Sequence, residues 1–88
     1  MSLSKFHARV YVTLKPTVND PQGLAIRTGL HHLGFESVDS VRMGKYLEVG
    51  LEAASAPAAT EQIDQMCRQL LANPVIESYR FEVTASPS

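Results

Sequence analysis

The stretch VRMGKYLE, residues 41–48, lies at the middle of the 88-residue chain. Before it, apolar residues recur first at strand spacing and then at helical spacing, and the same order repeats after it, finishing on a strand. A glycine followed by a lysine at its centre suits a tight turn between two strands. We therefore expect residues 41–48 to form a central hairpin, from which two similar halves of the fold extend.

A strand and a helix are expected before this hairpin. Residues 6–15 alternate apolar and polar side chains, which is typical of a half-buried strand. Asp20 suits the start of a helix because its carboxylate can accept hydrogen bonds from unpaired amides, and Pro21 needs no donor at the first helical position. Gly34 can end the helix in the left-handed conformation. The apolar stripe of this helix comprises Leu24, Ile26, Leu30 and Leu33.

Two strands are expected to meet at the hairpin. Residues 35–42 form the second strand, and a bulge reconciles the uneven spacing of its inward candidates. Gly44 and Lys45 make the turn. Residues 46–52 alternate again and form the third strand, with Leu47, Val49 and Leu51 pointing inward.

A second helix and a fourth strand are expected after the hairpin. Residues 53–59 contain small side chains and read as a surface connection or a frayed first turn. The helix runs from Thr60 to Asn73, because Pro74 disfavours the helical conformation of the residue before it. Residues 75–84 form the fourth strand. The helical apolar positions are Ile63, Met66, Cys67, Leu70 and Leu71.

The order strand, helix, strand, strand, helix, strand predicts an α+β, ferredoxin-like βαββαβ two-layer sandwich. Its four-stranded antiparallel sheet carries both helices on one face, and residues 1–88 form a single domain with an ordered core over residues 6–84. The second and fourth strands are the edges, where another chain can pair, so we expect an oligomer. The open face presents His7, Arg9, Tyr11, Thr13, Tyr46, Glu48, Arg80 and Glu82.

Composition excludes several classes of protein. With 44% apolar and 19% charged residues the chain resembles an ordinary globular protein, and no apolar run reaches the roughly 20 residues that span a bilayer. The N-terminus lacks a signal-peptide pattern, so we expect a cytoplasmic protein without membrane contact. Residues 1–45 carry six basic and three acidic side chains, whereas residues 46–88 carry two and six. This asymmetry is too small to indicate nucleic acid binding, but it can help chains orient one another.

The residues that could carry chemistry form no recognised catalytic, cofactor or metal motif. The three histidines, His7, His31 and His32, have no acidic or cysteine partner at a ligand spacing. Cys67 falls on the apolar stripe of the second helix, where cysteine acts as a small apolar residue. Gly44 and Lys45 lack the remaining positions of a phosphate-binding loop. We therefore expect no catalytic residue, no cofactor and no metal on this chain.

Two other binding modules share the predicted topology. An RNA-recognition module needs basic and stacking residues on its third strand, but here Tyr46 is flanked by Glu48 and Glu52, which would repel phosphate. A regulatory domain that senses an amino acid is harder to exclude on the basis of the residues alone, because such domains also pair along sheet edges. The pattern therefore predicts an interaction module and leaves its partner open.

Four segments together resemble one family, the PurS subunit of phosphoribosylformylglycinamidine (FGAM) synthase. The likeness runs in order over residues 6–83. The segments that carry it are VYVTLK at 10–15, DPQG at 20–23, VRMGK at 41–45, and MC with LLANPVIE at 66–67 and 70–77.

The resemblance implies a non-catalytic small subunit of a ligase complex in de novo purine biosynthesis. It implies a homodimer or a tetramer that bridges an ATP-dependent synthetase subunit (PurL) and a glutaminase subunit (PurQ). ATP, Mg and glutamine would be used by those subunits, and this chain would hold no cofactor. Contact with the partners would fall on the residues that match the family motifs, together with the adjacent tyrosine: Asp20, Gln22, Gly23, Arg42, Gly44, Lys45 and Tyr46.

Overall fold

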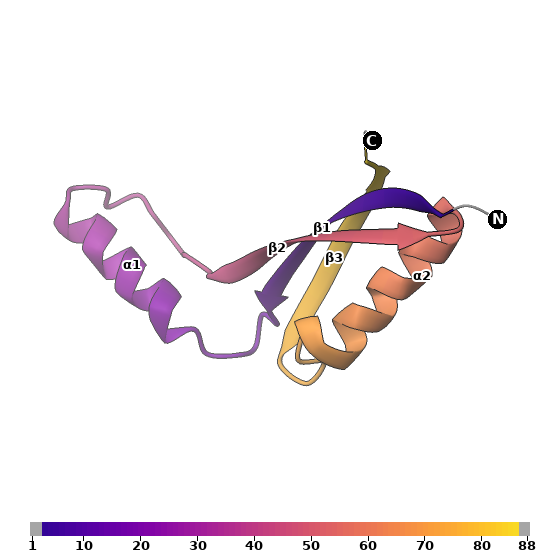
Figure 1. Ribbon diagram of the computed structural model, residues 1–88. Coiled ribbons are helices and arrows are strands. Elements are labelled where there is room, and N and C mark those ends of the chain that lie inside the picture. Colours follow the sequence, from indigo (N-terminus) through magenta and orange to yellow (C-terminus); the bar gives the residue numbers. More distant parts are fainter. Residues whose placement is uncertain (1–2, 87–88) are drawn as a thin grey trace.

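The computed structural model describes residues 3–86 and contains a sheet with one helix packed on it and a second helix held away from it (Figure 1). In chain order the elements are β1 (Ser4–Leu14), α1 (Pro21–His32), β2 (Gly44–Ala53), α2 (Ala56–Met66), the single π-helical turn η1 (Cys67–Leu71) and β3 (Glu77–Ala85). No helix among these residues is long and apolar enough to cross a membrane.

The sheet has three strands within the described residues, in the order β2-β1-β3, and both pairings are antiparallel. Val10 at the centre of β1 lies opposite Leu47 of β2 and Phe81 of β3. The alternation predicted for these three strands is confirmed, because Ala8, Val10 and Val12 are buried while their neighbours along β1 are more exposed. β1 is therefore the central strand and carries the inner face of the sheet.

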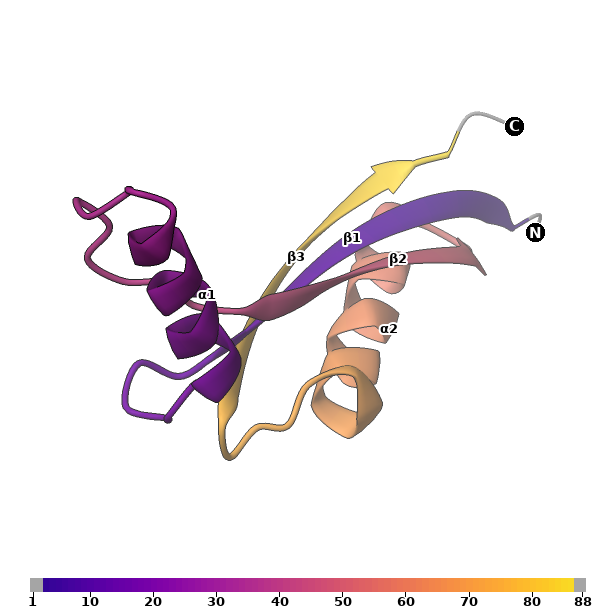
Figure 2. The ribbon, with the colours of Figure 1, turned by 90° about the vertical axis from the view of Figure 1, so that its left-hand side faces the viewer.

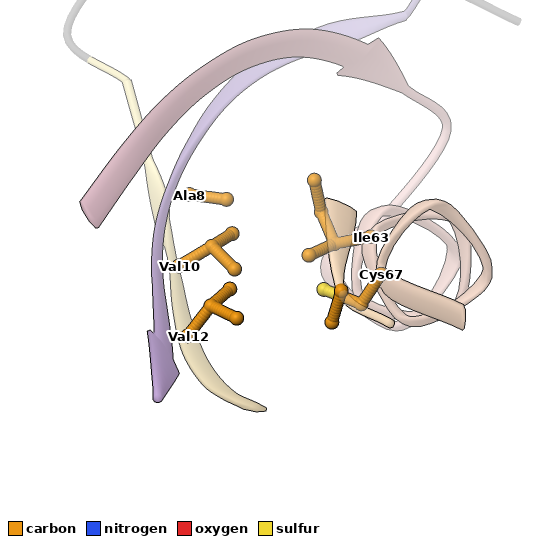
Figure 3. Packing of buried hydrophobic residues seen from close by; sticks show 6 residues of the cluster. Ala8, Val10, Val12, Ile63 and Cys67 are labelled. Carbon is orange, nitrogen blue, oxygen red and sulfur yellow. The ribbon is translucent and has the colours of Figure 1, made fainter. Parts of the chain in front are cut away.

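The main core lies between β1 and α2. Side chains of Ala8, Val10 and Val12 point toward Ile63 and Cys67, as Figure 3 shows. All five are at most 1% exposed. The interpretation of Cys67 as a core residue is thus confirmed, and burial raises the pKa of its thiol, with Asp64 adding to the effect.

The predicted boundaries of α1 are confirmed at both ends. Asp20 is the N-cap and Pro21 occupies the first turn. At the other end Gly34 has φ of 100°, and its amide donates to the carbonyl of His31 while the amide of Phe35 donates to that of Leu30. These two bonds form a Schellman motif, which a residue with a side chain would strain.

The predicted second strand over residues 35–42 does not form, so the predictions of a central hairpin and of a four-stranded sheet are both wrong. The uneven apolar spacing of this segment does not match the two-residue repeat of a strand. The ring of His31 also donates to the carbonyl of Val38 at 2.8 Å, which ties the segment to the end of α1. Gly44 and Lys45 are not a turn, because they begin β2 opposite Thr13 and Val12.

The expectation that both helices cover one face of the sheet is also wrong. α2 lies across the sheet, whereas α1 stands beyond its end on two connecting segments (Figures 1 and 2). The Cα radius of gyration is 17.2 Å, compared with about 12 Å for a compact domain of this length. The predicted fourth strand, β3, is an edge of the sheet as expected, and β2 is the other edge because the predicted second strand is missing.

The second helix begins earlier and ends differently than expected. Ser55 accepts from the amide of Ala58 at 3.2 Å, so most of the 53–59 segment forms the cap and first turn of α2. At the other end the amide of Ala72 donates to the carbonyl of Cys67, five residues back. This wider turn shifts the apolar register, and Leu70, predicted to face inward, is 82% exposed.

Candidate functional site

The seven residues predicted to contact partners gather where α1 joins the sheet. We call the two connections there, residues 15–20 and 39–43, the neck. Asp20 ends the first connection and Arg42 lies in the second. Gln22 and Gly23 lie in the first turn of α1, and β2 begins with Gly44, Lys45 and Tyr46. The structure therefore brings together residues that are more than twenty positions apart in the sequence.

Asp20 is the most buried polar residue of the neck, with 4% of its surface exposed. Its Oδ1 accepts from the amide of Gly23 at 2.9 Å, and its Oδ2 accepts from the amide of Met43 at 2.7 Å. The Met43 bond is the largest cause that holds the pKa of this carboxyl below its usual value; the Gly23 bond follows, and the guanidinium of Arg42 adds to the effect. Asp20 is therefore an ionised group that faces the inside of the neck.

Arg42 binds the other connection through its guanidinium. Nη2 donates to the carbonyl oxygen of Lys15 at 2.9 Å and to that of Val18 at 2.9 Å. A charged donor shared by two carbonyls makes stronger hydrogen bonds than a neutral one would. The two N–H groups of Nη2 are thus already used within the chain, while the side chain as a whole is exposed.

Glycine is required at two positions by the close approach of the backbone. A Cβ added at Gly23 would overlap the carbonyl oxygen of Val41 and the carboxylate of Asp20. One added at Gly44 would overlap the carbonyl oxygen of Val12. Gly23 therefore allows close packing at the neck and Gly44 allows it between β1 and β2, and neither offers a side chain for recognition.

Three of the seven residues remain free to meet another molecule. Gln22 and Lys45 are exposed and border a shallow open cavity of about 260 Å³ on the neck. Tyr46 is 50% exposed on the outer face of the sheet. The residues that line the cavity are Leu14, Asp20, Gln22, Met43, Gly44, Lys45 and Glu77.

Next to the neck, the outer face of the sheet carries an aromatic cluster. The ring centroids of Tyr11 and Tyr46 are 5.2 Å apart, and the guanidinium carbon of Arg80 lies 3.9 Å from the centroid of the Tyr11 ring. Further along this face Nε2 of His7 donates to the carboxylate of Glu48 at 3.0 Å. The predicted polar and aromatic face is confirmed, and its charges are largely paired within the chain.

The described residues hold no group of three or more His, Cys, Asp or Glu placed to bind a metal ion. The hydroxyl of Tyr79 donates to Oδ1 of Asp64 at 2.6 Å, which raises the pKa of that tyrosine. This pair sits between α2 and β3 beside the core. Its position suits packing of α2 on the sheet better than proton transfer to a substrate.

Sequence reasoning missed two features of this region. The carbonyls of Lys15 and Val18 are the partners of Arg42, and no side-chain pattern indicates a backbone acceptor. Large apolar side chains also remain exposed on α1 and just after it, and between α2 and β3. They are Leu24, Ile26, Leu33, Phe35, Leu70, Val75 and Ile76.

Comparisons with known proteins agree with one another. The family model of PurS, phosphoribosylformylglycinamidine (FGAM) synthase, matches residues 7–85. The phosphoribosylformylglycinamidine synthase subunit PurS of Synechocystis is 55% identical over 80 residues, which are 91% of this chain and 80% of that protein. The PurS subunit structure from Thermotoga maritima is 30% identical, has a TM-score of 0.86, and is matched over 96% of this chain and 97% of its own. A chain in the PurLQS structure from the same organism is 32% identical, with a TM-score of 0.81 over 96% of this chain and all of its own.

Proposed function

The chain belongs to the PurS family of FGAM synthase subunits, and from this premise we propose that it is a non-catalytic homodimer bridging two larger subunits. FGAM synthase is a ligase complex of purine biosynthesis. In the proposal, PurL uses ATP and Mg, PurQ releases ammonia from glutamine, and this chain holds no cofactor. Bridging in the cytoplasm would let ammonia pass between the two sites without dilution or protonation in solvent.

The main observation in support of the homodimer is that one apolar side of α1 is not covered by the rest of the chain. At 3.6 residues per turn, Ile26, Leu30 and Leu33 lie within about 60° of one another on the helix. Ile26 is 42% exposed and Leu33 is 75% exposed. Leu24 lies on the opposite side, where it borders a cavity with Val41. A helix of 12 residues with such a stripe gains little stability until another surface covers the stripe.

The surface area of the chain supports the same proposal. Its solvent-accessible area is 6262 Å², whereas a compact monomer of this mass exposes about 5,100 Å². The excess is of the size that one partner buries in a stable protein–protein interface, about 800 Å² or more. An isolated chain therefore leaves a surface exposed that is large enough to form an interface with a partner.

A second copy of the chain offers a surface that α1 can cover. On the inner face, Val49 of β2 and Phe81 of β3 are only partly buried, since α2 alone does not enclose both edge strands. If α1 of each copy packs beside α2 of the other, each sheet face carries two helices. The predicted ferredoxin-like arrangement of helices would then arise from two chains, in a closed exchange with two-fold symmetry.

In this arrangement the larger subunits meet the surfaces that the homodimer leaves open. We assign that contact to Gln22, Lys45 and Tyr46, together with the adjoining cluster of Tyr11 and Arg80. Tyrosine and arginine are enriched at interface centres, and Lys45 adds an unpaired charge that can orient an acidic partner surface. The PurLQS structure of the T. maritima relative supports the choice of partners.

The homodimer is tested by removing the stripe. An Ile26→Ser, Leu33→Ser double variant should sediment as a monomer at concentrations where the unaltered chain is a dimer. Thr28→Ser with His32→Ser is the matched control, because both residues are exposed on the other side of α1. A stripe variant that stays dimeric would contradict the proposed use of α1.

Bridging is tested by reconstituting the synthase from its three subunits. Omitting this chain should abolish glutamine-dependent synthesis while synthesis from added ammonia persists, and Lys45→Ala should weaken assembly. The purified chain alone should neither hydrolyse glutamine nor consume ATP. Turnover by the chain alone, or full glutamine-dependent activity without it, would overturn the proposal.

A further inference from the structure

The neck is held by hydrogen bonds that cross between its two connections. Asp20, at the end of the first connection, accepts from the amide of Met43 in the second at 2.7 Å. Arg42, in the second, donates to the carbonyls of Lys15 and Val18 in the first at 2.9 Å each. Three bonds therefore run in opposite directions across the neck, and each involves a charged side chain.

The same residues also join the neck to the helix. Asp20 accepts from the amide of Gly23 in the first turn of α1, so one carboxylate holds the helix start and the returning connection together. The backbone of Gly23 approaches the carbonyl of Val41 so closely that a Cβ would not fit. Contacts at Asp20 and Arg42 thus connect the start of α1 to the segment that leads into β2, well away from the core of the sheet.

We infer that Asp20 and Arg42 are positioning residues that fix the direction of α1, and thereby decide which surface of a second copy α1 reaches. This inference rests on the proposed homodimer. It assigns an internal role to two residues whose family motifs suggested contact with other subunits. Contact with those subunits then falls to neighbours such as Lys45, whose side chain is exposed.

Small changes at the neck are amplified at the far end of α1. The helix has 12 residues and is about 18 Å long. A rotation of about 20° at the neck moves its last turn by about 6 Å, which is more than one helical pitch. A displacement of that size takes the stripe out of register with its partner surface. A closed dimer would then give way to monomers or to open-ended assemblies.

The test compares matched variants of the full chain. Asp20→Asn keeps the side-chain volume but turns an amide group toward a backbone donor, and Arg42→Met removes the donors while keeping an apolar stem. Asp39→Asn and Lys45→Met are the controls, because they remove the same charges from exposed side chains in the neck and next to it. Arg42→Lys is a milder variant that keeps the positive charge but cannot reproduce the paired geometry.

The first readout is amide hydrogen exchange at Gly23 and Met43, with Val10 of the central strand as internal reference. Asp20→Asn and Arg42→Met should lower protection of the neck amides at least about tenfold while Val10 stays protected, and the controls should match the unaltered chain. Neck protection unchanged in both variants would overturn the inference. If the protection of Val10 also falls in these variants, the milder Arg42→Lys variant is measured instead. The inference then requires that Arg42→Lys lower amide protection at Gly23 and Met43 while Val10 stays protected.

The second readout is sedimentation velocity. The Asp20 and Arg42 variants should lose the closed dimer, whereas Asp39→Asn and Lys45→Met should keep it. Retention of the dimer in the first pair would also overturn the inference. An unaltered chain that is monomeric would instead contradict the proposed homodimer, and the exchange measurement would still report on the neck.

Discussion

At the scale of single residues, Asp20 shows how one side chain acquires a second role from the fold. Its place before Pro21 suffices to predict a helix cap, and the bond to the Gly23 amide confirms it. The shorter bond to Met43 depends on a residue 23 positions away. Because both oxygens are used, replacing the carboxylate affects the helix start and the neck together.

The ionisation of Asp20 predicts a pH dependence. Its folded pKa lies below the ordinary value of about 3.9, so its stabilising effect is complete above that pH and is lost as pH falls through the folded value. The difference in unfolding midpoint in urea between the unaltered chain and Asp20→Asn should therefore shrink on acidification from about pH 6 to about pH 2. A difference that stays constant over this range would show that the charge is not involved. Asp39→Asn, at an exposed carboxylate, is the control.

At the scale of elements, the contact between β1 and α2 forms the main core. Ile63 is completely buried against β1, and a hydrogen bond from the hydroxyl of Tyr79 to Asp64 connects β3 to α2. The π-helical turn after α2 keeps Cys67 in the core while turning Leu70 outward. The apolar pattern of this segment therefore serves the core at Ile63, Cys67 and Leu71, while Leu70 lies at the surface.

Replacing Ile63 with alanine should lower the free energy of unfolding by about 2–5 kcal/mol, because it leaves a cavity between helix and sheet. Glu61→Ala, at an exposed position of the same helix, should change it by no more than about 0.5 kcal/mol. Urea unfolding followed by far-ultraviolet circular dichroism measures both. Equal effects of the two substitutions would mean that α2 does not pack on the sheet in this way.

At the scale of the whole molecule, the chain is elongated, with extents of 58 × 29 × 14 Å. Its sheet has one helix on its inner face, and its other helix has no sheet to cover. Folding energy from such an arrangement is limited, since much apolar surface remains in contact with water. Association and folding are therefore expected to be linked.

Linkage predicts that thermal stability depends on protein concentration. The Tm of the unaltered chain should rise with each tenfold increase in concentration, since dissociation accompanies unfolding. The Ile26→Ser, Leu33→Ser variant should have a lower Tm that no longer changes with concentration. Differential scanning calorimetry over two decades of concentration measures this. A Tm independent of concentration in the unaltered chain would argue against a homodimer.

The sequence by itself determined the features that depend on neighbouring residues. Alternation defined β1, β2 and β3, because side chains on a strand point to opposite faces in turn. Asp20, Pro21 and Gly34 marked the ends of α1 through their local hydrogen-bonding and backbone preferences. The resemblance to the PurS family, based on short motifs in a fixed order, was also confirmed.

Only the tertiary structure decided where α1 lies, that residues 35–42 form no strand, and that Arg42 binds the backbone of the other connection. Each depends on contacts beyond adjacent residues: the ring of His31 donates to the carbonyl of Val38, seven positions on, and Arg42 donates to the carbonyls of Lys15 and Val18 in another segment. Local propensity cannot show which distant group will satisfy a donor, because that choice is made when the whole chain packs. The central stretch 41–48, expected to be a hairpin, is for this reason part neck and part strand.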